Sequence, residues 1–569
     1  MSQPAKRWEI TPRAPADHLA KFPDLSPLVV QILHNRGIVD PVEVADFLNH
    51  GQHDDDPFRL KGMLVTVDRL RQAIVHQEPI AIYGDYDVDG VTSTTVVVQM
   101  LMALQAQVRP YIPNRFDEGY GLNNDALTEL AEQGVKVVLT VDCGIRSVNE
   151  VIHGNSLGLD MIITDHHSVG AELPPALAVI NPKQADCNYP FKELAGVGLA
   201  YKLVQAMLQT DIPNPQGIKA EDFLDLVALG TVADLAPLHG ENRALAAHGL
   251  RKLNQSLRPG LSALLQESGT RPVSITAGTI GFVLGPRLNA AGRLDSAWAA
   301  YNLLMAKTEF EAIHMAQQLD LQNKERQKLT HEMVEIARQA VLADEGQSPI
   351  YLISHQDFNP GVVGLAASRL VEEFYRPVLV AERGATETKG SARSIAEFHV
   401  TMALDECADL LLRYGGHAAA AGFTLKNENV AALQERLLSI AHGELNMADL
   451  RPTISLDAEV NLRGVRPSLV QLILDLEPFG IGNPTPRFCS RNLTVKQCRT
   501  VGQDQKHLKL TLFDGKQDWD AIGFQLGHWL GQLTPGREVD IAYNLEFNEW
   551  QGQKKMQLGL KDIRLSEAG

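Results

Sequence analysis

The chain contains 569 residues, of which 44% are hydrophobic and 21% are charged, and its formal net charge is −17. This length exceeds one hydrophobic core and predicts about three or four domains of ordinary globular composition. The sequence has no apolar run of about 18 residues, no apolar signal-peptide core near its start, and five scattered cysteines without a CxxC pair, which excludes a transmembrane helix, a secretory leader and a cysteine-type zinc site. We therefore expect a protein of the reducing cytoplasm without a membrane partner.

The negative charge also bears on nucleic acid binding. Phosphate contacts usually require a basic surface, so a net charge of −17 taken alone argues against a nucleic acid partner. The net charge is a sum over the whole chain, however, and a metal site can hold many of the acidic residues. A local basic groove therefore stays compatible with this composition.

The first 60 residues are predicted to be mainly helical. Residues 26–38 (SPLVVQILHNRGI) and 40–49 (DPVEVADFLN) combine apolar positions at helical spacing with residues that favour helix starts. We interpret residues 1–60 as a packed N-terminal extension that carries no chemistry of its own.

Residues 80–90, IAIYGDYDVDG, carry the strongest chemical signal. The first four predict a short buried strand, and Asp85, Asp87 and Asp89 follow at every second position. In an extended segment alternate side chains point the same way, so we expect three carboxylates to face one spot. A hard divalent cation, Mg²⁺ or Mn²⁺, would offset their mutual repulsion, and the alternative is a solvated acidic turn.

Strands and helices alternate between residues 62 and 190. Further strands are predicted at 107–112, 135–141, 160–164 and 176–180, with helices at 91–104 and 122–133. This alternation predicts a parallel, doubly wound sheet, in which ligands bind beyond the carboxyl ends of the strands. Asp87, Asp142 and His166 each lie just past such an end. We therefore expect these side chains to meet at one edge of the sheet.

Two features of the helical region 195–300 are chemically notable. Asp234 lies in an otherwise apolar stretch, where it is either a helix cap or a further metal ligand. Arg287 and Arg293 lie among glycines and small residues, and arginine in a glycine-permitted turn suits an oxyanion or a phosphate.

The next region is predicted to contain a long helix and a second α/β unit. Residues 308–344 lack glycine and proline and have apolar residues at helical spacing, which predicts one helix, or two in line, joining two halves. Residues 348–445 then contain two glycine-rich stretches, 389–394 (KGSARS) and 415–423 (GGHAAAAGF). These stretches, with Ser391, Arg393 and His417, suit close backbone approach to a phosphate, and the alternative is tight turns between packed elements.

Residues 452–569 show alternation at period two and predict a small β-barrel of the OB-fold type. Asp514 and Gly515 predict a hairpin turn. Aromatic residues of this region either stack on bases or belong to the core and rim, and they are Trp519, Phe524, Trp529, Phe547 and Trp550.

Four motifs, in this order and spacing, resemble those of the DHH phosphoesterase superfamily: DYDVDG (85–90), VDCG (141–144), DHH (165–167) and VADL (232–235). A resemblance to the associated DHHA1 domain lies in three stretches: NPGVVGLAASR, KGSARS and GGHAAAAGF. The resemblance narrows to the bacterial exonucleases specific for single-stranded DNA at NRFDEGYG (114–121) and GPRLNAAGR (285–293). It covers nearly the whole chain, and the acidic positions of the motifs are intact.

The resemblance implies two divalent cations, Mn²⁺ or Mg²⁺. Carried over by position, the implied metal ligands are Asp87, Asp89, Asp142, His166 and Asp234. Asp142 would bridge the two ions. Two metals about 4 Å apart activate a water and clamp the phosphate during in-line displacement, so no covalent nucleophile is needed.

Three further residues are implied to take part in catalysis. Asp85 and Asp165 would be ligands or would orient ligands, and His167 would contact the scissile phosphate and stabilise developing charge. Some superfamily members have a histidine at the position of Tyr83, four residues before the first of two ligand aspartates. Asp85 or water would take that place here.

Members of the family release nucleoside 5′-monophosphates from a 5′ end, which requires a pocket for the terminal phosphate. The resemblance places there Arg115, Arg287, Ser391 and Arg393, with His417 nearby. A groove between two domains, too narrow for a duplex, would account for single-strand preference, and the barrel would grip the strand.

We therefore predict an α/β fold class. A parallel-sheet DHH domain (61–305) is joined by a long helix (306–345) to a second α/β domain, DHHA1 (346–447), and an OB-like barrel follows (448–569). The expected function is metal-dependent 5′→3′ digestion of single-stranded DNA in recombination and repair. The resemblance implies single-stranded-DNA-binding protein and a RecQ-type helicase as partners, and a monomer.

Three alternative functions are open, and the first of them falls within the same superfamily. A phosphodiesterase of small nucleotides, such as an oligoribonuclease or a cyclic-dinucleotide hydrolase, would usually lack the C-terminal barrel. An inorganic pyrophosphatase would need neither a long groove nor a barrel. A catalytically inactive DNA-binding relative would not need the intact acidic motifs.

Overall fold

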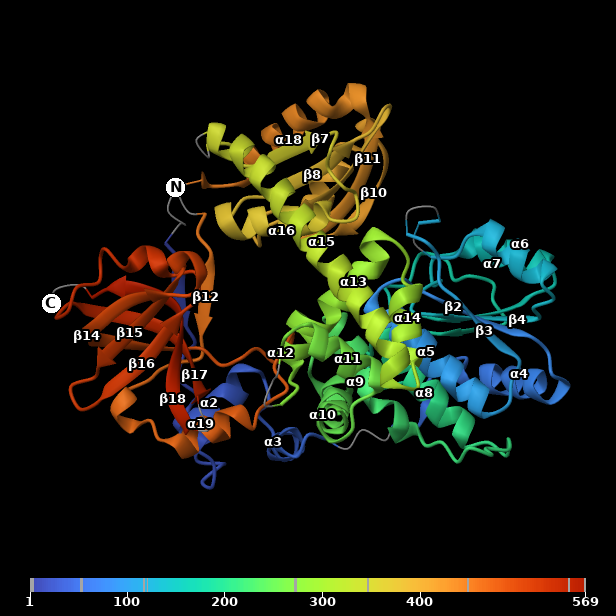
Figure 1. Ribbon diagram of the computed structural model, residues 1–569, viewed down its shortest axis with the longest axis horizontal. Coiled ribbons are helices and arrows are strands. Elements are labelled where there is room, and N and C mark those ends of the chain that lie inside the picture. The colour runs from blue at the N-terminus through green and yellow to red at the C-terminus, as the bar shows by residue number, and fades with distance from the viewer. Residues whose placement is uncertain are drawn as a thin grey trace. The chain divides into compact units, whose positions relative to one another are not determined.

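Two compact units make up the computed structural model of this chain (Figure 1). The structure describes residues 5–51, 55–115, 118–119, 121–270, 274–344, 347–447, 450–550 and 553–566, apart from the side chains of Gln503, Glu549, Trp550 and Gln553. The larger unit contains Glu9–Leu319 and the chain from Ser455 onward, and the smaller contains Asp320–Ile454 with the residues up to Trp8. Within the described ranges, no helix has the length and apolarity to cross a membrane.

The parallel sheet predicted between residues 62 and 190 is confirmed in the larger unit. Its strands lie in the order β3 (Val108–Tyr111), β2 (Ile80–Gly84), β4 (Val137–Val141), β5 (Asp160–Thr164) and β6 (Ala178–Ile180). Every neighbouring pair is parallel. Strand β2 leads to β3 on one side, and the chain then returns to place β4 on the other. The gap between the ends of β2 and β4 is therefore the topological switch point, where ligands bind in such sheets.

Helices bury both faces of this sheet, as a parallel sheet requires. Successive strand residues alternate between the faces, so Ile80 and Ile82 join one core and Ala81 and Tyr83 the other. The helices are α4 (Met63–His76), α5 (Val88–Ala103) and α8 (Gly196–Leu208) on the first face, and α6 (Asn124–Glu132) and α7 (Val148–Ser156) on the second (Figure 1).

A helical region completes this domain. It contains α9 (Leu224–Ala233), α10 (Gly240–Gln255), α11 (Pro259–Glu267), α12 (Ala277–Thr279), a π-helical turn (Ile280–Leu284), α13 (Gly285–Leu294) and α14 (Trp298–Met305). The expectation of a glycine-permitted turn around Arg287 is wrong, because this segment is helix α13. Its glycines serve packing instead: a Cβ added at Gly292 would lie 2.7 Å from the Tyr86 carbonyl oxygen.

The predicted connecting helix is a single element, α15 (Glu309–Ala343). The smaller unit then forms a five-stranded sheet in the order β10 (Leu411–His417), β11 (Ala420–Lys426), β9 (Glu387–Arg393), β8 (Val378–Arg383) and β7 (Tyr351–His355). Helices α16 (Val363–Phe374), α17 (Val400–Asp405) and α18 (Val430–Glu444) accompany it. The glycine-rich stretches lie in strands β9, β10 and β11, so tight turns do not account for their glycines. Gly390 leaves room for the Phe423 ring, which a Cβ would approach to 2.4 Å.

The C-terminal region is the predicted β-barrel. Its strands are β13 (Ala458–Glu459), β14 (Phe488–Val501), β15 (His507–Phe513), β16 (Asp518–Gly523), β17 (Glu538–Trp550) and β18 (Gln553–Leu565). The sheet order is β13-β14-β15-β16-β18-β17, and pairing of β14 with β17 closes the barrel. The hairpin turn at Asp514 and Gly515 is confirmed: Gly515 has a φ of +88°, and the Asp514 carboxylate accepts two backbone N–H groups.

The N-terminal extension packs into the barrel core. Helices α2 (Pro27–Asn35) and α3 (Pro41–Leu48) form as predicted, and Val30 and Leu33 share a buried cluster with barrel residues such as Phe488. The extension is not purely helical, since β1 (Arg7–Ile10) pairs with β12 (Thr453–Leu456).

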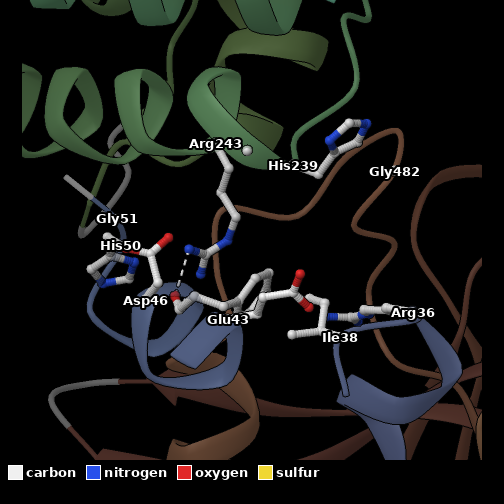
Figure 2. A pocket seen from close by; sticks show the side chains of 11 residues that line it. Arg36, Ile38, Glu43, Asp46, His50, Gly51, His239, Arg243 and Gly482 are labelled. Atoms are coloured by element: carbon white, nitrogen blue, oxygen red, sulfur yellow. Dashed lines mark hydrogen bonds between the residues drawn. The ribbon is translucent and has the colours of Figure 1, made fainter. Parts of the chain in front are cut away.

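A buried arginine joins the extension and the barrel to helix α10. Arg243 is 2% exposed, and Figure 2 shows its side chain reaching from α10 toward the helix that carries Glu43 and Asp46. Its guanidinium carbon lies 3.6 Å from the centroid of the Phe47 ring. Its N–H groups donate to the carbonyls of Phe47 (2.7 Å), Leu476 (3.2 Å) and Glu477 (3.0 Å). A cavity of about 440 Å³ surrounds this joint.

Candidate metal centre and active site

The first acidic motif lies where strand β2 passes into helix α5. Asp87 is the N-cap of α5, and its carboxylate accepts the N–H of Gly90 at 3.0 Å. Asp89 therefore lies in the first helical turn. The expectation that the three aspartates share one extended segment is wrong, because an aspartate N-cap favours a helix start at this point. The helix separates Asp89 from Asp85 and Asp87 and directs it to a different group of ligands.

The candidate ligands fall into three overlapping groups, and within each group the donor atoms lie within 4.8 Å of one another. The first group is Asp85, Asp87 and Asp142, the second is Asp89, His166 and Asp234, and the third is Asp142, His166 and His167. His166 Nε2 lies 3.0 Å from Asp142 Oδ1 and 3.8 Å from both Asp89 Oδ2 and Asp234 Oδ2. The structure thus brings together all five predicted metal ligands, with Asp85 and His167 beside them.

Asp142 and Asp89 are fixed by local backbone features that sequence reasoning missed. Asp142 directly follows strand β4 and has a φ of +63°, an uncommon conformation for a residue other than glycine. The N-terminus of α8 holds Asp89, whose carboxylate accepts the N–H groups of Gly196 (2.7 Å) and Val197 (2.8 Å). Gly196 permits this approach, since a Cβ there would lie 2.7 Å from Asp142 Oδ1. The small residues of AGVG (195–198) were the available signal.

Of the two interpretations of Asp234, helix cap or metal ligand, its position favours the metal ligand. Helix α9 ends at Ala233 and Asp234 is its C-cap residue, while the carboxylate also joins the second ligand group. A negative charge at a helix C-terminus is unfavourable with the helix dipole. The position is therefore explained by the ligand group and not by capping.

Burial and mutual repulsion perturb the acidic cluster strongly. Burial, followed by the charge of Asp87, raises the pKa of Asp234 to about 7. Burial raises the pKa of Asp142 and of Asp89 well above the usual range, and neighbouring carboxylates add to both shifts. The His166 pKa is lowered to about 3, first by burial and then by the charge of His167. A neutral imidazole among carboxylates is the protonation state that metal binding requires.

Among the residues that the structure describes, three buried polar atoms of the cluster find no hydrogen-bond partner: Asp85 Oδ1, Asp142 Oδ1 and His166 Nε2. The last two lie 3.0 Å apart without the alignment of a hydrogen bond. Unpaired buried acceptors are costly, and a divalent cation would satisfy them and offset the repulsion. Carboxylate oxygens and imidazole nitrogens at this spacing fit Mn²⁺ or Mg²⁺.

Asp165 acts on His167 and is not a member of any ligand group found among the described residues. Its Oδ1 accepts His167 Nδ1 at 2.7 Å and the His167 backbone N–H at 3.0 Å, and its Oδ2 accepts the Ile145 N–H at 2.9 Å. Burial alone would lower the pKa of His167, but the hydrogen bond to Asp165 and the negative charges of Asp165, Asp234 and Asp87 together outweigh it, so the pKa is raised. Of the two roles left open for Asp165, the structure favours orientation.

Tyr83 points away from the acidic cluster. It is fully buried in the core that faces α6 and α7, its ring stacks on Tyr111 at a centroid distance of 4.8 Å, and its hydroxyl donates to the Gly121 carbonyl at 3.1 Å. Asp85, two residues later in the chain, instead contributes to the first ligand group.

The predicted phosphate-binding residues divide between the two units. In the larger unit the Arg115 guanidinium carbon lies 5.2 Å from the centroid of the Tyr86 ring, beside the first acidic motif. Arg287 lies on α13, which is anchored to the same motif because Asn289 Oδ1 accepts the Val88 N–H at 3.1 Å. Asn289 was not among the site residues predicted from the sequence.

In the smaller unit, Ser391 and Arg393 lie together on β9. Arg393 Nη1 donates to Ser391 Oγ at 2.6 Å, and a Cβ added at Gly364 would lie 2.9 Å from Arg393 Nη2. Gly364 therefore brings the first turn of α16 close to both side chains, an arrangement that suits an anion. His417 ends β10 in the same cross-strand row as Arg393, through Ala420.

The barrel aromatics have mixed environments. Trp519 is 2% exposed and belongs to the core, whereas Phe524 is 66% exposed. Trp529 and Phe547 are half-buried, and the side chain of Trp550 lies outside the described residues. Phe524 is thus the most exposed of these rings, and Lys554 Nζ lies 4.3 Å from the centroid of the Phe547 ring.

Family models agree with this arrangement. The "DHH family, N-terminal domain" matches residues 79–231, the "DHHA1 domain" matches residues 346–443, and the "RecJ OB domain" matches residues 456–562. The fold and the acidic centre thus define a DHH-type phosphoesterase with a DHHA1 domain and an OB barrel, as the motifs predicted.

Known proteins share this architecture over nearly the whole chain. The single-stranded-DNA-specific exonuclease RecJ of Bacillus subtilis (strain 168) is 42% identical over 99% of this chain and 71% of its own length. The crystal structure of RecJ from Thermus thermophilus in complex with Mn²⁺ matches with a TM-score of 0.84 at 30% identity, covering 99% of this chain and 80% of that one. Its complex with Mg²⁺ matches with a TM-score of 0.77 at 28% identity, covering 99% and 79%. The chain belongs to the RecJ family.

Proposed function

We propose that this protein is a metal-dependent exonuclease that digests single-stranded DNA from the 5′ end to nucleoside 5′-monophosphates. The observation that carries the proposal is the buried cluster at the switch point of the parallel sheet, where Asp142 and His166 keep unpaired atoms 3.0 Å apart. Such a cluster is costly in a protein that merely binds DNA. The family relationship, whose members are named single-stranded-DNA-specific exonucleases, supports the substrate.

Two sets of side chains would hold the cations. Asp85, Asp87 and Asp142 form one set, and Asp89, His166 and Asp234 form the other. Bound Mn²⁺ or Mg²⁺ ions supply an activated water for in-line attack and neutralise charge on the scissile phosphate. Asp142 Oδ1, in the first set, lies 3.0 Å from His166 Nε2 in the second, which favours Asp142 as a ligand common to both sets.

His167 would bind the scissile phosphate. Its Nδ1 is held by Asp165, and the raised pKa favours a proton on each ring nitrogen. The side chain is 45% exposed, so Nε2–H can donate to a phosphate oxygen as negative charge develops there. In this assignment Asp165 orients His167 and does not touch the substrate.

The polarity of digestion would depend on recognition of a terminal phosphate. Arg115 and Arg287 in the larger unit, and Ser391, Arg393 and His417 in the smaller, are the proposed residues. Arginine is suited to this task because its planar fork matches phosphate oxygens. We assign the barrel to holding the strand, with Phe524 and Phe547 as base-stacking surfaces.

We infer a role in recombination and repair in the cytoplasm, with single-stranded-DNA-binding protein and a RecQ-type helicase as partners. The helicase would provide the single strand, and the binding protein would present it. Family membership supports this inference.

The experiment that tests the proposal is digestion of one single strand carrying a label at its 5′ or its 3′ end. We expect 5′ label to be released first, as mononucleotide, with Mn²⁺ or Mg²⁺, and no release with EDTA or in Asp142→Ala. Asp125→Ala, an exposed aspartate of α6, is the matched control and keeps activity. Cleavage confined to dinucleotides or cyclic dinucleotides would instead indicate a small-nucleotide phosphodiesterase. Strand binding without cleavage would indicate an inactive relative.

A further inference from the structure

The described residues between β3 and α6, 112–115, 118–119 and 121–123, are here called the Arg115 loop, and a hydrogen-bond network centred on Glu118 holds them. Glu118 Oε1 accepts the Asn114 backbone N–H at 2.7 Å. Glu118 Oε2 accepts the Tyr111 hydroxyl and Asn123 Nδ2, each at 2.7 Å. The two carboxylate oxygens therefore tie the residue before Arg115 to strand β3 on one side and to the start of α6 on the other.

Tyr83 connects this network to strand β2. Its hydroxyl donates to the Gly121 carbonyl at 3.1 Å and accepts from Asn123 Nδ2 at 3.3 Å, and its ring stacks on Tyr111 at an interplanar angle of 27°. Strand β2 also leads directly into Asp85 and Asp87. The same strand thus positions the acidic motif at its end and, through the Tyr83 hydroxyl, the far end of the Arg115 loop.

The network acts on the position of Arg115 relative to the acidic motif. Arg115 follows Asn114 directly, and its guanidinium carbon lies 5.2 Å from the centroid of the Tyr86 ring. Tyr86 is the residue between Asp85 and Asp87 in the sequence. Loops lose their geometry readily when internal anchors are removed, because few buried contacts hold them. Fixing the backbone at Asn114 and Gly121 limits where the guanidinium can reach.

We propose that Glu118 is a positioning residue for recognition of the 5′-terminal phosphate, acting through Arg115, and that Tyr83 is its anchor on the sheet. The proposal rests on the proposed function, in which Arg115 binds that phosphate. It assigns a role to Tyr83, at a position where the resemblance implies a histidine in some superfamily members. Glu118 itself contacts neither the substrate nor the cations in this assignment.

The test compares kcat/KM for one single-stranded oligonucleotide with a 5′-phosphate and with a 5′-hydroxyl. Glu118→Ala should lower the ratio of the two about tenfold or more, the size expected when a hydrogen bond to a charged group is lost. The change should appear mainly in KM for the phosphorylated substrate. Glu118→Gln keeps one acceptor oxygen and should be intermediate. Glu132→Ala, an exposed acid of α6, should match the wild type.

A double-mutant cycle with Arg115 separates the proposed role of Glu118 from the proposed binding of the 5′-phosphate by Arg115. If Glu118 acts through Arg115, the double variant Arg115→Ala/Glu118→Ala should have the same ratio as Arg115→Ala alone. An unchanged ratio in Arg115→Ala would refute the phosphate site itself. A ratio that falls in Arg115→Ala but stays at the wild-type value in Glu118→Ala would overturn the role of Glu118 alone.

The Mn²⁺ requirement is a further readout, and it excludes a merely structural effect of the Glu118 substitution. The Mn²⁺ concentration for half-maximal activity should not change in Glu118→Ala, because the proposed role leaves the acidic cluster intact. A shift in this concentration would contradict the proposal.

If Glu118→Ala does not fold, Glu118→Gln and Tyr83→Phe decide the question. Tyr83→Phe keeps the ring and removes the hydroxyl, so it should lower the ratio in the same direction. Wild-type ratios in both variants would overturn the proposal.

Discussion

Asp165 Oδ1 accepts a hydrogen bond from His167 Nδ1 at 2.7 Å, two residues along the same turn. The aspartate is 1% exposed and the histidine side chain is 45% exposed. A buried carboxylate thus holds an imidazole whose other edge faces solvent. The second carboxylate oxygen of Asp165 accepts the Ile145 backbone N–H, so Asp165 cannot turn away from His167 without losing a buried hydrogen bond.

Replacing this carboxylate should affect catalysis more than metal binding. In Asp165→Asn we expect kcat to fall roughly 10- to 100-fold, because the neutral amide no longer stabilises charged His167. The half-saturating Mn²⁺ concentration should stay within about twofold of the wild type, since Asp165 belongs to no ligand group found among the described residues. Asp186→Asn, in an exposed pair with Lys61, is the control. A large shift in the Mn²⁺ requirement would show that Asp165 is a ligand.

Gly196 should tolerate no side chain. A Cβ there would lie 2.7 Å from Asp142 Oδ1, so Gly196→Ala should displace this ligand and lower activity by about 100-fold or more. A Cβ at Gly198 on the same helix has the Leu194 side chain as its nearest neighbour, at 3.1 Å, so Gly198→Ala should keep most activity. Initial rates on labelled single strand, at saturating Mn²⁺, measure both. Equal activity in the two variants would contradict the close approach of α8 to Asp142.

The metal-free protein should lose stability as pH rises. The folded-state pKa of Asp234 is about 7, against 3.8 for the exposed group, so its contribution is fully present below about pH 3.8 and is lost as pH rises through about 7. Asp234→Asn stays neutral and lacks this dependence. With EDTA, the Tm of the variant should exceed that of the wild type at about pH 8 and approach it at low pH. Mn²⁺ should restore the wild type more than the variant, and parallel pH profiles would contradict the raised pKa.

Arg243 should hold the barrel and the N-terminal extension on helix α10. Arg243→Ala leaves three carbonyl acceptors without their donor and removes the contact with the Phe47 ring, a loss on the order of 3 kcal/mol. We expect a lower Tm and faster proteolysis between α3 and α4. Arg251→Ala, an exposed position on the same helix, is the control. Equal proteolysis rates in the two variants would show that Arg243 does not hold the barrel and the N-terminal extension on helix α10.

Local sequence patterns predicted much of the fold because they reflect periodic burial. The run of five buried residues in β2 and in β4 predicted strands of a parallel sheet, and residues 308–344 predicted the long helix within one or two residues. The motif order also predicted which acids gather in one cluster. The pattern failed at Asp89 and Arg287, where helix α5 begins within the acidic motif and helix α13 replaces the expected turn.

The sequence by itself determined the parallel sheet, the barrel, the family and the acidic residues, because periodicity and motif spacing are local properties of the chain. Only the tertiary structure decided how those acids divide into groups, that Gly196 and Val197 hold Asp89, and that Glu118 ties the Arg115 loop to Tyr83. The hydrogen bonds among these contacts join residues up to 108 positions apart. Distances of a few ångströms between such residues are set by the packing of whole helices and strands, which local patterns do not encode.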